Sequence, residues 1–215
     1  MTRRIFELGS KEDYYEWFDD FHSYAAADWT ITTTEAGAGD ATEAVGNLAG
    51  GVLVLTNDAA DNDADFLQYA KETFKFVSGK VLRFQARFKV SDATESDFVM
   101  GLQITDTTPL AVTDGIYFRK DDGDALLDFV VIKNSTATTI TGAHTMVDDT
   151  WVTVEFYYDG SGSDIDVFID GVSVGAAALT NVPDDEELAI SFGIQNGEAV
   201  AKVMSVDFIH AIAGR

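Results

Sequence analysis

Residues 151–171 read WVTVEFYYDGSGSDIDVFIDG, and this stretch carries most of the information about the fold. Apolar and aromatic side chains alternate with polar ones on both sides of the DGSGSD segment, which is typical of two strands joined by a turn. A second turn follows at Asp170-Gly171, a dipeptide that favours the backbone of tight hairpins. The stretch therefore predicts antiparallel β-structure.

The same two-residue period extends through the chain from residue 29 onward. It is clearest at 81–90 (VLRFQARFKV), where apolar residues at even positions alternate with Arg83, Gln85, Arg87 and Lys89. Similar runs predict further strands at 52–56, 98–105, 115–119, 126–133, 151–158, 165–170, 188–195 and 203–210. About ten short strands, separated by turn residues and without helical segments between them, predict an all-β, two-sheet antiparallel sandwich.

Composition limits both the architecture and the partners. The 215 residues suit one sizeable domain, which we assign to 29–215. The absence of cysteine excludes disulfides, thiolate zinc sites and cysteine nucleophiles. A formal charge of −23 would repel phosphate backbones and argues against nucleic-acid binding, and no run is apolar enough for membrane insertion.

The N-terminal segment has a different pattern. Tyr14, Trp17, Phe18 and Phe21 are spaced at i, i+3, i+4 and i+7, which predicts an amphipathic helix over 10–24. We assign residues 1–28 to a short helical or extended arm. Its aromatic stripe either packs on the edge of its own sandwich or docks on a neighbouring subunit.

The order of several short elements resembles concanavalin A-like (laminin G-like) jelly-roll domains. These elements are FDDF at 18–21, Trp29, GGVL at 50–53, WVTV at 151–154, FIDG at 168–171 and VDFI at 206–209. The resemblance implies a jelly-roll sandwich, a fold that hosts lectins, glycosidases and structural modules alike. Function must therefore be argued from sites.

The opening run, from DDFHSYAAADW to the acidic segment after GGVLVLT, also resembles virion structural proteins of tailed bacteriophages. That resemblance implies a capsid decoration or head-fibre module, assembled in a host cytoplasm and displayed on the virion. Its partner would be coat protein, and we expect a homo-oligomer. The predicted attachment residues are in the arm: Arg3, Arg4, Tyr14, Trp17, Phe18 and Phe21.

Catalytic patterns are weak. Glycosidases of this fold resemble one another in a strand-borne E-x-D-x-x-E motif, which this sequence lacks. The nearest match is formed by Asp164, Asp166 and Asp170. Their pattern is more typical of a solvated strand face that ends in a turn. His22, His144 and His210 are scattered and lack a nucleophile elbow. We therefore expect no enzymatic activity and no catalytic residue.

One acidic segment has the spacing of a calcium loop. Asp61, Asp63 and Asp65 alternate, and Glu72 follows Asp61 by eleven positions. The sixth position, where such loops need glycine, is Phe66. A looser calcium site and a plain acidic loop both remain open, and no other cofactor is expected.

Two surfaces are candidates for binding. The face with Arg83, Arg87 and Lys89 either meets an acidic partner or pairs with neighbours such as Glu155. The aromatic residues either form a platform for sugar rings or fill the core; they are Tyr117, Trp151, Tyr157 and Tyr158. The alternative function is thus a lectin module that binds glycan for adhesion to a host surface.

Overall fold

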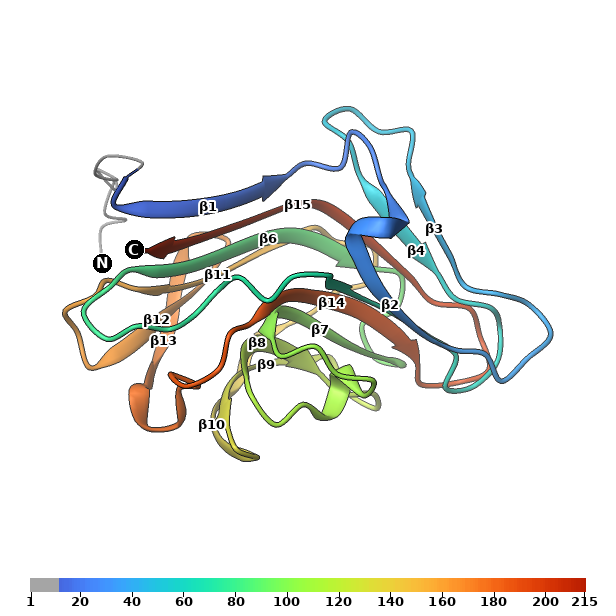
Figure 1. Cartoon of the computed structure of the whole chain (residues 1–215). Coiled ribbons are helices and arrows are strands. Elements are labelled where there is room, and N and C mark those ends of the chain that lie inside the picture. The colour runs from blue at the N-terminus through green and yellow to red at the C-terminus, as the bar shows by residue number, and fades with distance from the viewer. Residues whose placement is uncertain (1–11) are drawn as a thin grey trace.

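A computed structural model describes residues 12–215 and contains two antiparallel sheets packed face to face (Figure 1). The predicted all-β sandwich is confirmed. Within residues 12–215, regular helix is limited to three short 3-10 turns, η1 (Ala26–Asp28), η2 (Pro109–Ala111) and η3 (Leu179–Asn181). No helix in this part of the chain has the length and apolarity that crossing a membrane requires.

The larger sheet has eight strands. Along its main path lie β13 (Val172–Ala178), β12 (Asp164–Ile169), β11 (Val152–Tyr158), β6 (Leu82–Val90), β15 (Val203–Gly214), β4 (Leu53–Thr56) and β3 (Thr42–Val45), and β1 (Tyr14–Asp19) pairs with β15 beside this path.

The smaller sheet has seven strands. Their order is β10 (Thr136–Thr145), β9 (Leu126–Lys133), β8 (Gly115–Lys120), β7 (Ser96–Gln103), β14 (Ala189–Asn196), β5 (Ala64–Tyr69) and β2 (Trp29–Thr34).

The helix predicted over 10–24 is wrong, because residues 14–19 form strand β1. This strand runs antiparallel to the second half of β15, from Tyr14 opposite Gly214 to Asp19 opposite Ile209. Its side chains alternate: Tyr15 and Trp17 pack against the core, while Phe18 faces outward. The arm within the described residues is therefore extended and packs on its own sandwich.

Inward-facing aromatic rings fill the space between the sheets. Phe84 stacks on Phe156 across β6 and β11, with ring centroids 5.5 Å apart. Phe129 of the opposite sheet lies 5.5 Å from Phe156 and so joins the two layers. Burial of such large rings is the main stabilising contribution in a chain without disulfides.

A second apolar cluster lies on the outer face of the smaller sheet. Tyr117, Val99 and Phe66 form its centre, and Leu110 and Val112, from the segment between β7 and β8, pack against it. Buried amides hold that segment: Gln68 donates to the Ile104 carbonyl, and Gln103 to the Pro109 carbonyl. The middle of this outer face is therefore covered by the chain itself.

The predicted turns explain how the strands are connected. Asp170 and Gly171 have φ angles of 49° and 77°, so the turn between β12 and β13 is of the tight hairpin type. The DDGD segment at 121–124 turns between β8 and β9. Asn134 and Ser135 make a similar left-handed turn between β9 and β10.

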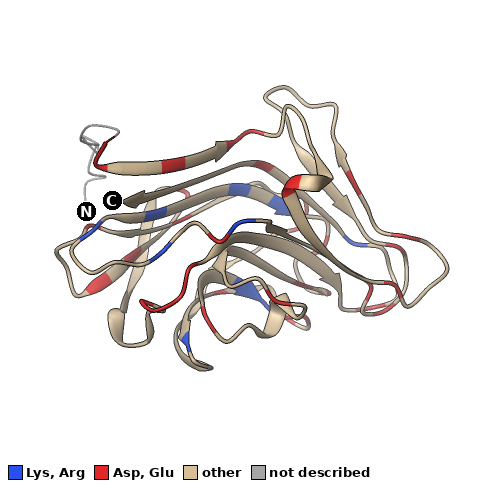
Figure 2. Cartoon of the chain, viewed as in Figure 1, with Lys and Arg blue, Asp and Glu red and all other residues tan. Residues whose placement is uncertain are grey.

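The charged face of β6 is paired within the larger sheet. Figure 2 shows basic residues along this strand, whereas many acidic residues lie in loops. Arg83 Nε lies 2.8 Å from Glu155 Oε1, and Arg87 lies 2.5 Å from Asp207. Cross-strand pairing, the second alternative for this face, accounts for these basic side chains.

Candidate ligand-binding site

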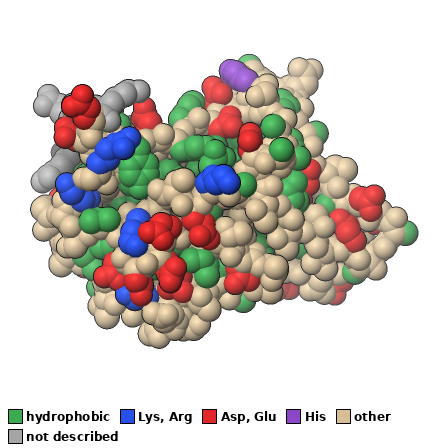
Figure 3. All heavy atoms as spheres, in the orientation of Figure 1, with side chains coloured by type: hydrophobic (Ala, Val, Ile, Leu, Met, Phe, Trp, Pro, Cys, Tyr) green, Lys and Arg blue, Asp and Glu red, His purple; other side chains and the backbone are tan. Residues whose placement is uncertain are grey.

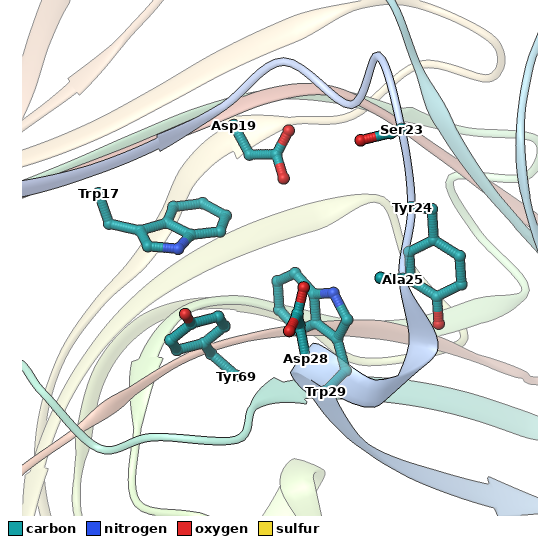
Figure 4. Close-up of a pocket in the computed structure, with 8 residues that line it drawn as sticks. All are labelled: Trp17, Asp19, Ser23, Tyr24, Ala25, Asp28, Trp29 and Tyr69. Atoms are coloured by element: carbon teal, nitrogen blue, oxygen red, sulfur yellow. The ribbon is translucent and has the colours of Figure 1, made fainter.

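A pocket of about 120 Å³ lies where β1 meets the edge of the smaller sheet (Figure 4). Strand β1, the segment that leads into η1, and strands β2 and β5 all contribute to it. It is lined by Trp17, Asp19, Ser23, Tyr24, Ala25, Asp28, Trp29 and Tyr69. On the face shown in Figure 3, hydrophobic side chains are exposed between acidic ones.

Three aromatic rings form one wall of the pocket. The centroid of Trp17 lies 6.0 Å from that of Trp29 and 5.7 Å from that of Tyr69, and Trp29 and Tyr69 are also 5.7 Å apart. All three contacts are edge-to-face, the preferred geometry of aromatic pairs. Trp29 is also anchored in the core by Phe192, at 5.2 Å. The wall is thus held rigidly from behind.

Two carboxylates, Asp19 and Asp28, complete the polar side of the pocket (Figure 4). The Asp19 carboxylate accepts a hydrogen bond of 2.7 Å from the Phe21 backbone N–H. Burial raises the pKa of Asp19, and the charges of Asp20 and Asp28 raise it further. The lining contains no lysine or arginine. The pocket therefore places two carboxylates beside a packed aromatic cluster.

The loop after β1 is shaped by a close contact with Gly51. A Cβ atom at Gly51 would lie 2.1 Å from the Asp20 carbonyl oxygen, and its φ of +83° also favours glycine. Phe21 has a positive φ of 51° and is fully buried. These two residues direct the chain from β1 across the sandwich edge toward the pocket.

A second acidic group, Asp65, acts electrostatically on Tyr24 of the pocket lining. Asp65 on β5 is fully buried, and neither of its carboxylate oxygens has a hydrogen-bond partner among the described residues. Burial and the neighbouring Glu43 on β3 raise the pKa of Asp65 to about 8. Burial and the same glutamate raise the pKa of Tyr24. Asp65 is therefore a neutral acid at pH 7.

The predicted attachment residues do not lie together: some are on one face of β1, some on the other, and one is in the loop that follows. Trp17 lines the pocket and Phe21 is buried in the core. Phe18 is 57% exposed and lies against Phe208 and His210 of β15. Tyr14 is half-buried on the same outward side, and Arg3 and Arg4 lie outside the described residues. Their role in attachment stays a prediction.

The predicted calcium residues do not converge. Asp61 is exposed, whereas Asp63 is buried and accepts hydrogen bonds from the backbone of Ala36 and Ala60. Asp65 faces the interior, and Glu72 accepts a hydrogen bond from the Thr105 N–H beyond the far end of β5. No group of three or more acidic or histidine residues within 12–215 is arranged to hold a metal ion. The reason is that residues 64–69 form a strand rather than a loop.

The predicted aromatic platform does not assemble either. Tyr117 and Tyr158 are buried, in the outer cluster and the main core respectively. Trp151 lies on the outer face of the larger sheet, where the Arg87 guanidinium lies 4.5 Å from its ring centroid. Tyr117 and Tyr158 thus fill apolar clusters, in agreement with the second alternative, and Trp151 makes a cation–π contact with Arg87.

Sequence reasoning identified Trp17 but not its neighbours Asp19, Asp28 and Tyr69. Asp19 falls within the segment predicted to be a helix, and Asp28 belongs to none of the motifs considered. Tyr69 falls at the end of a segment interpreted as an ion loop. A two-residue period over 15–19 was the one available signal, since it places Trp17 and Asp19 on one side of a strand.

Comparison with known proteins identifies the family of this chain. The profile of the SO2946-like, C-terminal domain family matches residues 47–207, about three quarters of the chain. The chain belongs to this family. Of the pocket residues, only Tyr69 falls within the matched range of the SO2946-like domain. No curated protein matches the sequence significantly.

Several solved structures share the fold. A protein of unknown function, SO2946 from Shewanella oneidensis MR-1, is 17% identical with a TM-score of 0.63, over 94% of this chain and 87% of that one. The potassium-bound carbohydrate recognition domain of Emp46p is 10% identical with a TM-score of 0.59, over 89% and 93%. At these identities the similarity establishes a concanavalin A-like, lectin-like fold for this SO2946-like domain.

A third neighbour corrects the expectation that the protein has no enzymatic activity. The GH16 protein of a Bacteroides ovatus mixed linkage glucan PUL, solved with a G4G4G3G product, is 13% identical with a TM-score of 0.64, over 91% of this chain and 99% of that one. The fold of the SO2946-like domain is thus also an enzyme fold. The missing E-x-D-x-x-E motif excludes only one arrangement of carboxylates, so it was no ground for excluding activity.

Proposed function

We propose that this protein is a carbohydrate-binding module whose ligand site is the pocket formed by Trp17, Trp29 and Tyr69. The observation that carries the proposal is the rigid aromatic wall beside two carboxylates. Aromatic faces pack against the apolar C–H faces of sugar rings, and carboxylates accept hydrogen bonds from hydroxyl groups. The lectin-like fold supports the same class of function.

The size of the pocket sets the mode of binding. Its 120 Å³ is below the roughly 300–1,000 Å³ of pockets that enclose a drug-sized ligand. It therefore suits one sugar residue, or one edge of it, while the rest of a chain lies on the surface. Affinity is then modest, with dissociation constants on the order of 0.1–1 mM, which corresponds to about 4–5.5 kcal/mol.

Titration calorimetry with soluble trisaccharides tests the proposal. We expect binding by the unaltered protein, and a loss of about tenfold or more in Trp17→Ala, because the aromatic wall loses one of its rings. Trp151→Ala is the matched control, since Trp151 lies on the outer face of the other sheet. Asp28→Asn, at an exposed position, tests the site without removing core packing. Equal affinity in all variants, or no binding by the unaltered protein, would overturn the proposal.

A second candidate, attachment within a virion, is favoured by the outward face of β1. Phe18 is exposed beside Phe208 and His210, and such aromatic groups concentrate at interface cores. On this reading the protein self-associates and binds coat protein through that face. Light scattering of Phe18→Ser against the unaltered protein tests self-association. An unchanged mass would count against this candidate.

A further inference from the structure

The charge of the pocket is its most unusual property. Two of its eight lining residues are aspartates, and none is basic. The imidazole of His22 lies 3.5 Å from Asp20 and, when it carries a proton, acts against the rise in the pKa of Asp19. The residues that line the pocket thus include two carboxylates and no lysine or arginine.

The aromatic wall reinforces this preference. The faces of tryptophan and tyrosine rings carry negative potential and attract ammonium groups within about 6 Å of their centroids. Trp17, Trp29 and Tyr69 pack edge-to-face with centroids 5.7–6.0 Å apart and all three line the pocket, so a small group bound there lies beside this aromatic cluster. A neutral sugar makes only apolar contacts with such rings, whereas a cation is also attracted by their negative potential.

The surroundings of Asp19 disfavour its ionised form. Burial of Asp19 and the negative charges of Asp20 and Asp28 raise the pKa of Asp19, which shows that its ionised form is disfavoured there. A positive group bound near both carboxylates removes that penalty. Binding of such a group is therefore coupled to full ionisation of Asp19.

We propose that the pocket selects sugars that carry a free, positively charged amino group, such as glucosamine units in a β-linked chain. The inference rests on the proposed function and specifies its substrate class. The ammonium group occupies the space between Asp19, Asp28 and the aromatic wall, and the sugar ring packs against the same wall. Its small volume admits an amino group more readily than the bulkier N-acetyl group.

The decisive experiment compares three trisaccharides that have the same linkage and differ at one position. Cellotriose carries a hydroxyl group there, the N-acetylglucosamine trimer an acetamide, and the glucosamine trimer an ammonium. In calorimetry at low salt and slightly acidic pH, we expect the glucosamine trimer to bind at least tenfold more tightly than the other two. Raising the pH until the amine is neutral should remove that advantage.

Matched variants distinguish the effect of the pocket carboxylates on ligand preference from the effect of the protein's overall negative charge. Asp19→Asn/Asp28→Asn should lose the preference, whereas Asp61→Asn/Glu186→Gln removes the same charge at exposed positions elsewhere and should keep it. Equal loss in both double variants would overturn the inference. Equal binding of all three trisaccharides would overturn the inference and leave the proposed function standing. Binding of none would overturn both, and binding of tetramethylammonium as tightly as the trimer would exclude sugar recognition.

Discussion

Asp65 illustrates how a single residue can make stability depend on pH. A carboxyl group with no hydrogen-bond donor in the protein interior costs several kcal/mol in its ionised form, so it keeps its proton on folding. Glu43 on β3 of the other sheet places a like charge near Asp65 and so disfavours its ionisation further. This behaviour could not be predicted from the sequence, because Asp65 lies among other aspartates in a segment that is typical of an exposed loop.

The raised pKa of Asp65 predicts that the protein loses stability as the pH rises. Its pKa is near 4 in the unfolded chain and about 8 in the folded one, so the folded state holds a proton that the unfolded state releases between these values. The contribution is fully present below pH 4, falls by roughly 1 kcal/mol per pH unit, and is lost above pH 8. Chemical denaturation from pH 5 to 9 measures it. Asp65→Asn, which cannot titrate, should flatten the curve, and an unchanged slope would contradict the assignment.

Gly51 predicts a second effect at the residue scale. Gly51→Ala should destabilise the protein by more than about 2 kcal/mol, because the new methyl group meets the Asp20 carbonyl at 2.1 Å and φ is positive. Gly79→Ala is the control, since Gly79 has a similar φ of +85° and nothing within 4 Å of the added atom. Denaturant unfolding of the pair isolates the contact. Similar losses in both variants would mean that backbone conformation alone matters.

At the scale of elements, the sequence predicted those strands whose two faces differ. β6 could be predicted because apolar residues alternate with four polar ones. β11 and β12 could be predicted because a Gly/Ser turn separates two alternating segments. β5 was missed because its aspartates suggested an ion loop, and β13 because its small residues give little contrast. β1 was misread since Tyr14, Trp17, Phe18 and Phe21 fit a helical period as well. The partner strand β15, 190 residues away, decided between the two.

Strand β1 is therefore expected to be part of the stable sandwich rather than a removable arm. Deleting residues 1–19 should lower the free energy of unfolding by several kcal/mol, because it uncovers the packing of Tyr15 and Trp17 and the edge of β15. Thermal unfolding and light scattering would detect the lower midpoint and new aggregation. A truncated protein as stable as the full chain would show that β1 contributes nothing to the sandwich.

The pocket is a product of the same pairing, which is why the sequence alone gave so little of it. Trp17 and Asp19 come from β1, Trp29 from β2 and Tyr69 from β5, so three strands of two different sheets must meet before the site exists. No local motif records such an assembly. Only the aromatic character of Trp17 marked it as a candidate for binding.

For the whole molecule, the formal charge of −23 dominates the electrostatics. The 14 basic residues offset only 14 of the 37 acidic ones, so the folded chain repels itself at neutral pH. Salt shortens the range of that repulsion from about 30 Å at 0.01 M to less than 10 Å above 0.15 M. Added NaCl should therefore stabilise the fold at pH 7 and raise the thermal midpoint by several degrees.

The same salt should act in the opposite direction on ligand binding, and this contrast tests the electrostatic account as a whole. Attraction between the pocket carboxylates and an ammonium group is weakened by screening, whereas self-repulsion is relieved by it. Near the isoelectric pH of about 4.1 the net charge vanishes, so the stabilisation by NaCl should vanish with it. Differential scanning calorimetry at pH 4 and pH 7, each at 10 and 300 mM NaCl, provides the comparison. A midpoint that rises equally with salt at both pH values would point to salt effects on hydrophobic burial rather than to charge, because burial does not depend on the net charge.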